Sequence, residues 1–472
     1  MSDYNFLMES RLSPEQLQIL NFLGRLAAIQ GLNFYLVGGA VRDLVQGQQP
    51  IRDLDFVVQG NPQKILRHLD YGLPSALPAS ETRSLAPEPV SPGVEHVILD
   101  KRWNAAEVRF KNGVHAEIAA SRNEIYHKPG RPPEIVPAMI FDDLKRRDFS
   151  ANALAISLHP NSRGLLLDPT NGSADLAQRE LRVLHSHSFA EDPSRIYRLL
   201  RLCLRLDFKP EERTRQLLES AIEDRVWEHT DPERQGRELR ATLEEENPGR
   251  VLKVLVDRGL LGGLDKKLAS ARIAYDRFAK VRAAARSLPR ADALLLNFHC
   301  LVEKLGGAHQ DRLARKILRH PATVKAALSL ERDARQLART LSGPKGARNS
   351  YLYAVLAAAP QHLLLFLLAF YREARVQSRV KAFLFKFPQL RAKLPRAELQ
   401  AMGMPPGPKF EKIIEQVFLD QLDGKIRSQS QTTAALRALS GIKEKPTQPA
   451  KPSAPTGKAH GSQRKTTSKR KG

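Results

Sequence analysis

Cysteine is nearly absent from this chain of 472 residues. Its two cysteines, Cys203 and Cys300, are too few for a disulfide framework or a zinc site, so we expect both to be core residues of a protein from a reducing compartment. Long apolar runs are absent too. The most apolar stretch, residues 363–370, is too short to span a bilayer and predicts a buried helix instead.

The N-terminus lacks the features of a targeting signal. Its first residues, MSDYNFLMES, contain neither a basic segment nor a long apolar run, so we expect no signal peptide. Together with the missing membrane segment, this predicts a soluble, cytoplasmic protein. Further on, Ser13 and Pro14 predict the start of a helix that Gly31 ends.

Acidic residues are few relative to basic ones. The chain has 51 Asp and Glu against 75 Lys and Arg, a formal net charge of +24. Between residue 442 and the C-terminus, nine Lys and Arg stand against one acid, which gives +8 and leaves +16 for the rest. The rest of the chain is therefore basic in its own right, which predicts a polyanionic partner such as nucleic acid; a solvated charged surface is the alternative.

Residues 35–58 predict a strand, a glycine turn, a short helix, a loop and a second strand. Gly38 and Gly39 begin the helix, where their small size lets backbone N–H groups approach an anion. Asp53 and Asp55 stand at i and i+2 on the second strand, so their carboxylates project from one face and can hold a divalent metal beside a phosphate. For either motif alone, an ordinary turn or an exposed acidic loop is the alternative.

Three predicted strands follow, at residues 96–100, 106–111 and 114–120. Asn112-Gly113 joins the last two and predicts a two-residue hairpin turn. Glu117 lies on the second strand of this hairpin, where a solvent-facing strand residue is the plain alternative to a functional acid.

Two later stretches carry polar side chains suited to nucleotide binding. Arg147 can offer a planar fork to a phosphate or sugar, and Asn152 can donate to a phosphate oxygen or ribose. Asp192 and Arg195 stand three apart on one helix, where a carboxylate and a guanidinium can accept from and donate to a base edge. Salt-bridged helices are the alternative in both places.

In combination, these motifs resemble a known family. The pattern Gly38-Gly39-x-x-Arg42-Asp43 with Asp53-x-Asp55 is similar to the nucleotidyltransferase signature of the polymerase-β superfamily. Three further stretches resemble the family motifs RRDFTxNA, with Ser150 in place of threonine, DPxxGxxDL and EDPxRxxRxxR: residues 146–153, 168–176 and 191–201. The chain thus resembles bacterial class II tRNA nucleotidyltransferases, the CCA-adding enzymes, and the related bacterial poly(A) polymerases.

The resemblance implies an α+β fold, in which an N-terminal mixed β-sheet head is followed by an all-α neck, body and tail. The helical periodicity after residue 211 agrees with this. The expected domains are a catalytic head, a base-selecting neck, an RNA-binding helical body and tail, and a disordered basic tail: residues 1–184, 185–262, 263–440 and 441–472.

The resemblance also implies the site residues. The catalytic acids, which would bind two Mg²⁺ ions, are Asp53, Asp55 and Glu117. The residues that would hold the triphosphate and the sugar are Gly38, Gly39, Arg42, Arg147 and Asn152. The residues that would select the base or contact the nucleotide from the neck helix are Asp192, Arg195, Arg198 and Arg201.

The implied reaction is the template-independent addition of CCA to tRNA from CTP and ATP, with release of pyrophosphate. An enzyme that adds only A, or a poly(A) polymerase, shares nearly all of these motifs. Residues 94–106 depart from the family because they lack its frequent Gly-Thr, and residues 71–93 form an insertion. A non-catalytic RNA-binding module is the alternative of another class, which the three acids argue against. We expect no protein partner.

Overall fold

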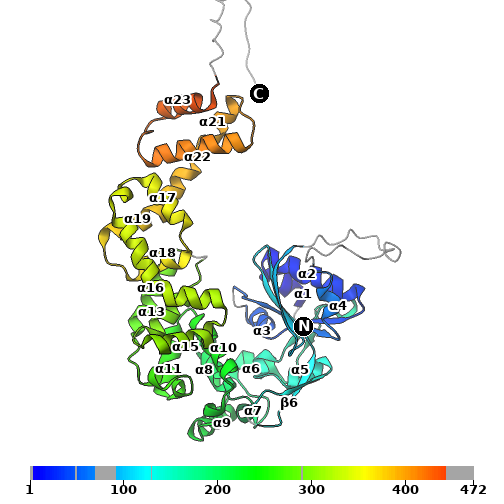
Figure 1. Ribbon diagram of the computed structural model, residues 1–472. Helices are drawn as coiled ribbons and strands as arrows, with labels where there is room; N and C mark the ends of the chain where they lie inside the picture. The colour runs from blue at the N-terminus through cyan, green and yellow to red at the C-terminus, as the bar shows by residue number, and fades with distance from the viewer. Residues whose placement is uncertain (1–3, 48–49, 70–91, 129, 289–290, 443–472) are drawn as a thin grey trace, which may run out of the picture. The chain divides into compact units, whose positions relative to one another are not determined.

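The computed structural model describes residues 4–47, 50–69, 92–128, 130–288 and 291–442 (Figure 1). The predicted insertion and the basic tail thus lie almost wholly outside the described residues. The chain divides into two compact units, the first formed by residues 1–342 with 359–380 and the second by residues 343–358 with 381–472. The predicted boundaries after residues 184 and 262 both fall inside the first unit and remain a prediction.

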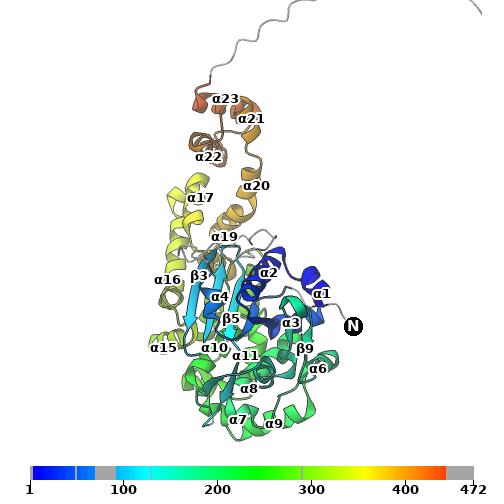
Figure 2. The ribbon, with the colours of Figure 1, turned by 90° about the vertical axis from the view of Figure 1, so that its right-hand side faces the viewer.

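The first unit begins with a seven-stranded sheet whose order is β3-β4-β5-β2-β1-β8-β9. Its strands are β1 (Asn33–Val37), β2 (Leu54–Gln59), β3 (Val94–Asp100), β4 (Ala105–Phe110), β5 (His115–Ala120), β8 (Ala155–Ser157) and β9 (Leu166–Leu167). Strands β2 and β5 run parallel and the other pairs antiparallel, which confirms the predicted mixed sheet (Figure 2).

The central strands of this sheet are covered by helices because their apolar residues are nearly continuous. Every residue of β1 after the first is buried. Helix α2 (Pro14–Ile29) packs along β1, and Ser13 caps it as predicted, with Gln16 completing the capping box. The apolar side chains of α5 (Ile140–Lys145) cover another part of β1 and β2.

The hairpin between β4 and β5 differs from the prediction by one residue. Phe110 donates its N–H to the carbonyl of Val114, so three residues form the turn rather than two. Gly113 takes the positive φ, 88°, that such a three-residue loop requires. The longer turn places Glu107 directly opposite Glu117.

The rest of the first unit is mainly helical (Figure 1). The helices are α1 (Tyr4–Arg11), α3 (Gly39–Gln46), α4 (Gln63–Leu66), α6 (Gly172–Gln178), α7 (Ser188–Glu191), α8 (Ser194–Leu206), α9 (Glu212–Glu223), α10 (Pro232–Leu243), α11 (Pro248–Asp257), α12 (Lys266–Ser270), α13 (Tyr275–Ala285), α14 (Leu294–Val302), α15 (Gly307–Leu318), α16 (Pro321–Ser342), α18 (Gln361–Phe370) and α19 (Ala374–Lys381).

Two small strand pairs accompany these helices. Strand β6 (Arg122–Ile125) pairs with β7 (Glu134–Pro137), and β10 (Glu180–Leu181) with β11 (Lys209–Pro210). Because β11 lies within the predicted neck, that segment is not purely helical, although the α+β fold class is confirmed. Helix α18 is largely buried, as its apolar sequence predicts. Among the described residues, no single helix is long and apolar enough to cross a membrane, and only the bent pair of α17 (Asn349–Ala358) with α18 reaches that composition.

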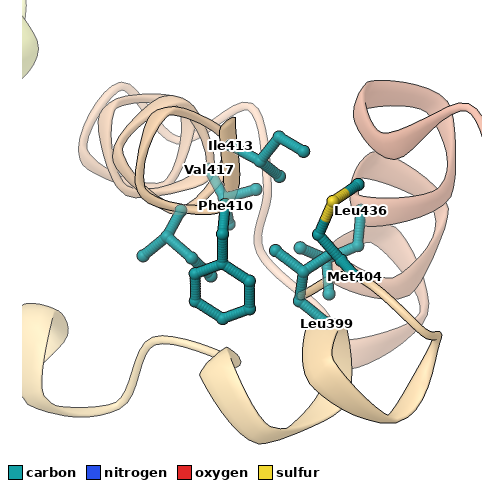
Figure 3. Packing of buried hydrophobic residues seen from close by; sticks show 7 residues of the cluster. Leu399, Met404, Phe410, Ile413, Val417 and Leu436 are labelled. Atoms are coloured by element: carbon teal, nitrogen blue, oxygen red, sulfur yellow. The ribbon is translucent and has the colours of Figure 1, made fainter. Parts of the chain in front are cut away.

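The second unit is helical and has an apolar core of its own. It contains α17, α20 (Phe387–Ala392), α21 (Arg396–Ala401), α22 (Pro408–Leu422) and α23 (Gln429–Ser440). Figure 3 shows part of this core, in which side chains of α21, α22 and α23 meet: Leu399, Met404, Phe410, Ile413, Val417 and Leu436. Met404 comes from the glycine- and proline-rich turn before α22, where Gly403 has a φ of 93°.

Candidate active site

The glycine turn after β1 lies next to the acidic strand. Gly38 has a φ of 69° and ends β1 at the start of α3. A side chain at Gly38 would meet Arg147 Nη1 at 3.2 Å and Asp55 Oδ2 at 3.5 Å. Only glycine therefore fits this position, which lies between a guanidinium and a carboxylate. Helix α3 ends at Gly47, which has the left-handed conformation typical of a helix C-terminus.

Two of the predicted acids face each other on neighbouring strands. Asp55 of β2 and Glu117 of β5 stand in register across the parallel pair. Asp53 is exposed and its Oδ1 lies 3.4 Å from His115 Nδ1. Burial, followed by the negative charges of Glu117 and Asp53, raises the pKa of Asp55 to about 7. The three acids are therefore close enough to repel one another.

This arrangement fits a divalent cation in its chemistry. Among the described residues, no three His, Cys, Asp or Glu side chains are close enough to form a ready-made metal centre. The donors that face one another are all carboxylate oxygens, the ligands that Mg²⁺ prefers. The negative charges of Glu117 and Asp53 contribute to the raised pKa of Asp55 after burial, and a bound cation would offset them.

The predicted phosphate and sugar ligands surround the glycine turn. Arg147 donates from Nε and Nη2 to Asp143 Oδ2, at 3.2 and 2.9 Å. Arg42 donates from Nη1 to Asn152 Oδ1 at 2.6 Å and from Nε to Asp43 Oδ1 at 2.8 Å. The structure thus brings Arg42, Arg147 and Asn152 to one place, and acids or amides hold each guanidinium in position.

Asp192 and Arg195 do not pair with each other. Arg195 donates to Ser188 Oγ at 2.6 Å and to the backbone carbonyl of Arg146 at 3.0 Å. Asp192 accepts from the backbone N–H of Ser194 at 3.1 Å and from Arg234. The alternative of a simple salt bridge along the helix is therefore wrong for this pair. Helix α8 begins at Ser194, so Asp192 lies before it, and the prediction that Asp192 and Arg195 stand on one helix is wrong.

Arg198 and Arg201 are held by acids from α10 and the residues after it. Arg198 donates to Glu238 Oε1 at 2.7 Å and to Asp148 Oδ2 at 3.0 Å. Arg201 donates to Glu238 Oε2 at 3.1 Å and to Glu245 Oε1 at 3.0 Å. Both arginines thus lie in an ion-pair network that joins the neck helix to the head.

The sequence motifs do not indicate that Arg234, Glu238 and Glu245 are parts of this site. Their partners, Asp192, Arg198 and Arg201, are roughly forty residues earlier in the chain, so no local motif connects them. One signal is present: Gln235, Glu238 and Thr242 recur at helical spacing and are buried in α10. Buried polar residues at that spacing predict partners on a neighbouring helix.

Comparison with known proteins places the chain in a family. Residues 34–87 and 88–182 match the model of the poly(A) polymerase head domain. The A-adding tRNA nucleotidyltransferase of Halalkalibacterium halodurans is 28% identical over 429 residues, which cover 89% of this chain and 92% of that protein. A solved structure of a CCA-adding enzyme in its apo form II matches with a TM-score of 0.51 and 25% identity, covering 93% of this chain and 99% of that one. Residues 34–182 thus match the poly(A) polymerase head-domain family, and the chain is similar over most of its length to bacterial tRNA nucleotidyltransferases.

Other members of this family are similar over a shorter range. The CC-adding tRNA nucleotidyltransferase of Deinococcus radiodurans is 36% identical over 258 residues, which cover 54% of this chain and 62% of that protein. Since its relatives are tRNA nucleotidyltransferases, the chain is an enzyme of the nucleotidyltransferase type. Nucleotidyltransferases of this family generally depend on divalent metal ions.

Proposed function

We propose that the protein adds nucleotides to the 3′ end of tRNA without a template, and that it adds CCA from CTP and ATP. One observation carries this proposal. Arg195, which would read the base, donates to the carbonyl of Arg146, and the next residue, Arg147, lies beside Gly38 and Asp55. A nucleotide whose phosphates lie at the glycine turn would therefore have its base directed to α8.

Each set of residues has a distinct task in this proposal. Asp53, Asp55 and Glu117 would hold two Mg²⁺ ions, which when bound lower the pKa of the attacking 3′-hydroxyl and neutralise the triphosphate. The residues that would bind the triphosphate and the sugar are Gly38, Gly39, Arg42, Arg147 and Asn152. Those that would face the base and the neighbouring phosphates are Asp192, Arg195, Arg198 and Arg201.

Asp192 would accept hydrogen bonds from the base, and Arg195 would donate to it. Burial raises the pKa of Asp192, but Arg234, Arg195 and Ser194 outweigh burial and hold the pKa below its usual range. The carboxylate is therefore ionised at neutral pH and can only accept hydrogen bonds. An acceptor beside a donor of fixed position selects among bases by their edges, without a nucleic-acid template.

RNA as the substrate is supported by charge, because the chain up to residue 441 carries +16. The domain division made from the sequence and the cytoplasmic location belong to the same proposal. An enzyme limited to adding A is the second candidate function. It is supported by the A-adding relative from Halalkalibacterium halodurans, which aligns with 89% of the chain.

The test offers four RNAs with CTP or ATP separately: tRNA transcripts that end before CCA, after C and after CC, and an unstructured RNA. We expect CTP to extend the first two transcripts and ATP to extend only the third. Extension by ATP alone, restricted to the CC-ending tRNA, would establish the A-adding function instead. Long adenylate tracts on the unstructured RNA would contradict both and identify a poly(A) polymerase.

A further inference from the structure

The two proposed base-reading side chains are held from the head by a group that we call the Trp103 cluster: Trp103, Arg122, Glu124, Tyr126 and Arg234. Four of these residues belong to the head, in the turn between β3 and β4 or on and beside β6, and Arg234 belongs to α10. Trp103 stands in the segment where the sequence departs from the family pattern. The role of this cluster rests on the proposed function, because it concerns how that site selects its nucleotide.

Arg234 is the member of the cluster that contacts a base reader. Its Nη1 donates to Asp192 and, at 3.2 Å, to the hydroxyl of Tyr126. Its guanidinium carbon lies 5.4 Å from the centre of the Trp103 ring and 5.8 Å from that of Tyr126. Since only a small part of the Arg234 side chain is exposed, these contacts are shielded from water. Cation–π attraction is strongest in such a desolvated place.

Trp103 is itself fixed by contacts within the head. Its backbone carbonyl accepts from Arg122 Nη1 at 3.0 Å, and its N–H donates to Asp100 Oδ1 at 3.3 Å. The ring is 9% exposed and packs with Ala105 and Ala119 of the sheet. The guanidinium of Arg122 lies 5.1 Å from the ring centre. The ring is therefore a rigid surface against which Arg234 rests.

The same cluster reaches the second base reader through the backbone. Tyr126 donates to Glu124 Oε2 at 2.8 Å, and Glu124 Oε1 accepts from Arg146 Nη1 at 2.7 Å. The carbonyl of Arg146 in turn accepts from Arg195. Burial, and after it the charge of Glu124, raises the pKa of Tyr126, so the hydroxyl keeps its proton and remains a donor to Glu124.

We propose that Trp103 is a positioning residue for nucleotide selection, because it holds Arg234 against Asp192 and thereby fixes the acceptor that reads the base. Trp103 itself touches no substrate. Its loss lets the guanidinium of Arg234 move and with it the carboxylate of Asp192. The consequence is weaker binding of the correct nucleotide and weaker rejection of the wrong one, without a matching loss in the rate of the chemical step.

The test measures incorporation with the full chain and Trp103→Leu. We expect the KM for the correct nucleotide to rise about tenfold, which is the size of a desolvated cation–π contact, while kcat stays within about twofold. Selection against UTP and GTP should fall by a similar factor. Trp103→Phe keeps an aromatic face and should return the KM to within about threefold of wild type.

Two further variants separate positioning from general damage. Arg102→Gln removes an exposed arginine that also stacks on Trp103, at 5.3 Å, but contacts neither base reader in the described structure; its KM should be unchanged. In an Asp192→Asn background, Trp103→Leu should raise the KM no further, because its effect passes through Asp192. An additive effect there, or an unchanged KM and selectivity in Trp103→Leu, would overturn the inference.

Failure of the proposed function is recognised separately, because wild-type protein would then extend none of the tRNA transcripts. Should Trp103→Leu not fold, Tyr126→Phe decides the question. Tyr126→Phe removes one hydroxyl that joins Arg234 to Glu124 and should raise the KM about fivefold. A wild-type KM in Tyr126→Phe would refute the role of the cluster.

Discussion

Asp55 and Asp192 are carboxylates of the same candidate site, yet their surroundings act on them in opposite directions. Burial raises the pKa of both. At Asp55 the charges of Glu117 and Asp53 add to burial, and the pKa rises to about 7. At Asp192 the charges of Arg234 and Arg195 outweigh burial, and the pKa falls below its usual value.

This difference in pKa indicates which interaction each carboxylate can still form. Asp55 on β2 and Glu117 on β5 are neighbouring carboxylates, and the charge of Glu117 adds to burial in raising the pKa of Asp55, so the strand edge is suited to binding cations. The negative charge of Asp192 is already balanced by protein groups, so the carboxylate can offer a ligand only its capacity to accept hydrogen bonds. Removing charge should therefore leave the fold intact at the first region and destabilise it at the second.

The largest effect is expected on activity at the first region. Asp55→Asn removes one proposed metal ligand while keeping the size of the side chain, and nucleotide incorporation should fall about a thousandfold. Since the substitution also removes repulsion with Glu117, the melting temperature should stay the same or rise. Incorporation into tRNA and thermal unfolding are the two measurements.

The matched control for that variant is Asp142→Asn, an exposed aspartate in the first turn of α5. It should leave incorporation unchanged. Substantial activity of Asp55→Asn would show that Asp55 is not a metal ligand. A marked drop in its melting temperature would show that Asp55 stabilises the fold.

A smaller effect, and one on stability, is expected at the second region. Asp192→Ala leaves the guanidinium of Arg234 buried without its carboxylate, which should lower the free energy of unfolding by about 3 kcal/mol. Denaturant unfolding measures the loss. The double variant Asp192→Ala with Arg234→Met removes the unpaired charge as well and should recover part of the stability. Equal stability of Asp192→Ala and wild type would show that removing the charge of Asp192 does not destabilise the fold, so that the two regions do not differ in this respect.

The same contrast explains how much of the site was predictable. The groups around Asp55 are close in sequence or on adjacent strands. Local patterns therefore predict them: a glycine turn, alternation along a strand and a hairpin. Partners of Asp192, Arg198 and Arg201 come from α10 and from Glu245 just after it, and Asp148 also holds Arg198. The packing that brings these segments together is not recorded by any local pattern. Arg195 illustrates the limit, since its acceptors could not be derived from its spacing to Asp192.

In the fold, too, some features are predicted by local sequence patterns and others depend on packing. The capped helix α2 and the buried helix α18 follow from apolar periodicity and end signals, which are local. The mixed sheet was implied by the family resemblance. The hairpin turn was wrong by one residue, because Asn112-Gly113 also suits a three-residue loop and only the packing of both strands sets the register. This one-residue difference in the turn decides whether Glu107 lies opposite Glu117 or opposite the residue next to Glu117.

The smallest effect is expected from a buried base, His299, at which burial is the largest cause of the pKa shift. Burial, and then the charge of Arg277, lowers the pKa of His299 on α14 to about 4. Glu303 lies 3.7 Å from its ring but is held by Arg277 at 3.1 Å, so it does not compensate the histidine.

Because the unfolded chain binds this proton at about pH 6.5 and the folded chain only near pH 4, the free energy of unfolding should fall by roughly 2 kcal/mol as the pH drops through that window. His299→Phe places an aromatic ring beside Phe366 and Phe370, and it should remove this part of the pH dependence. His127→Gln, at an exposed histidine, should keep the wild-type slope. An unchanged slope in His299→Phe would mean that burial alone does not shift a titratable group here, and the rise at Asp55 would then rest on its neighbouring acids.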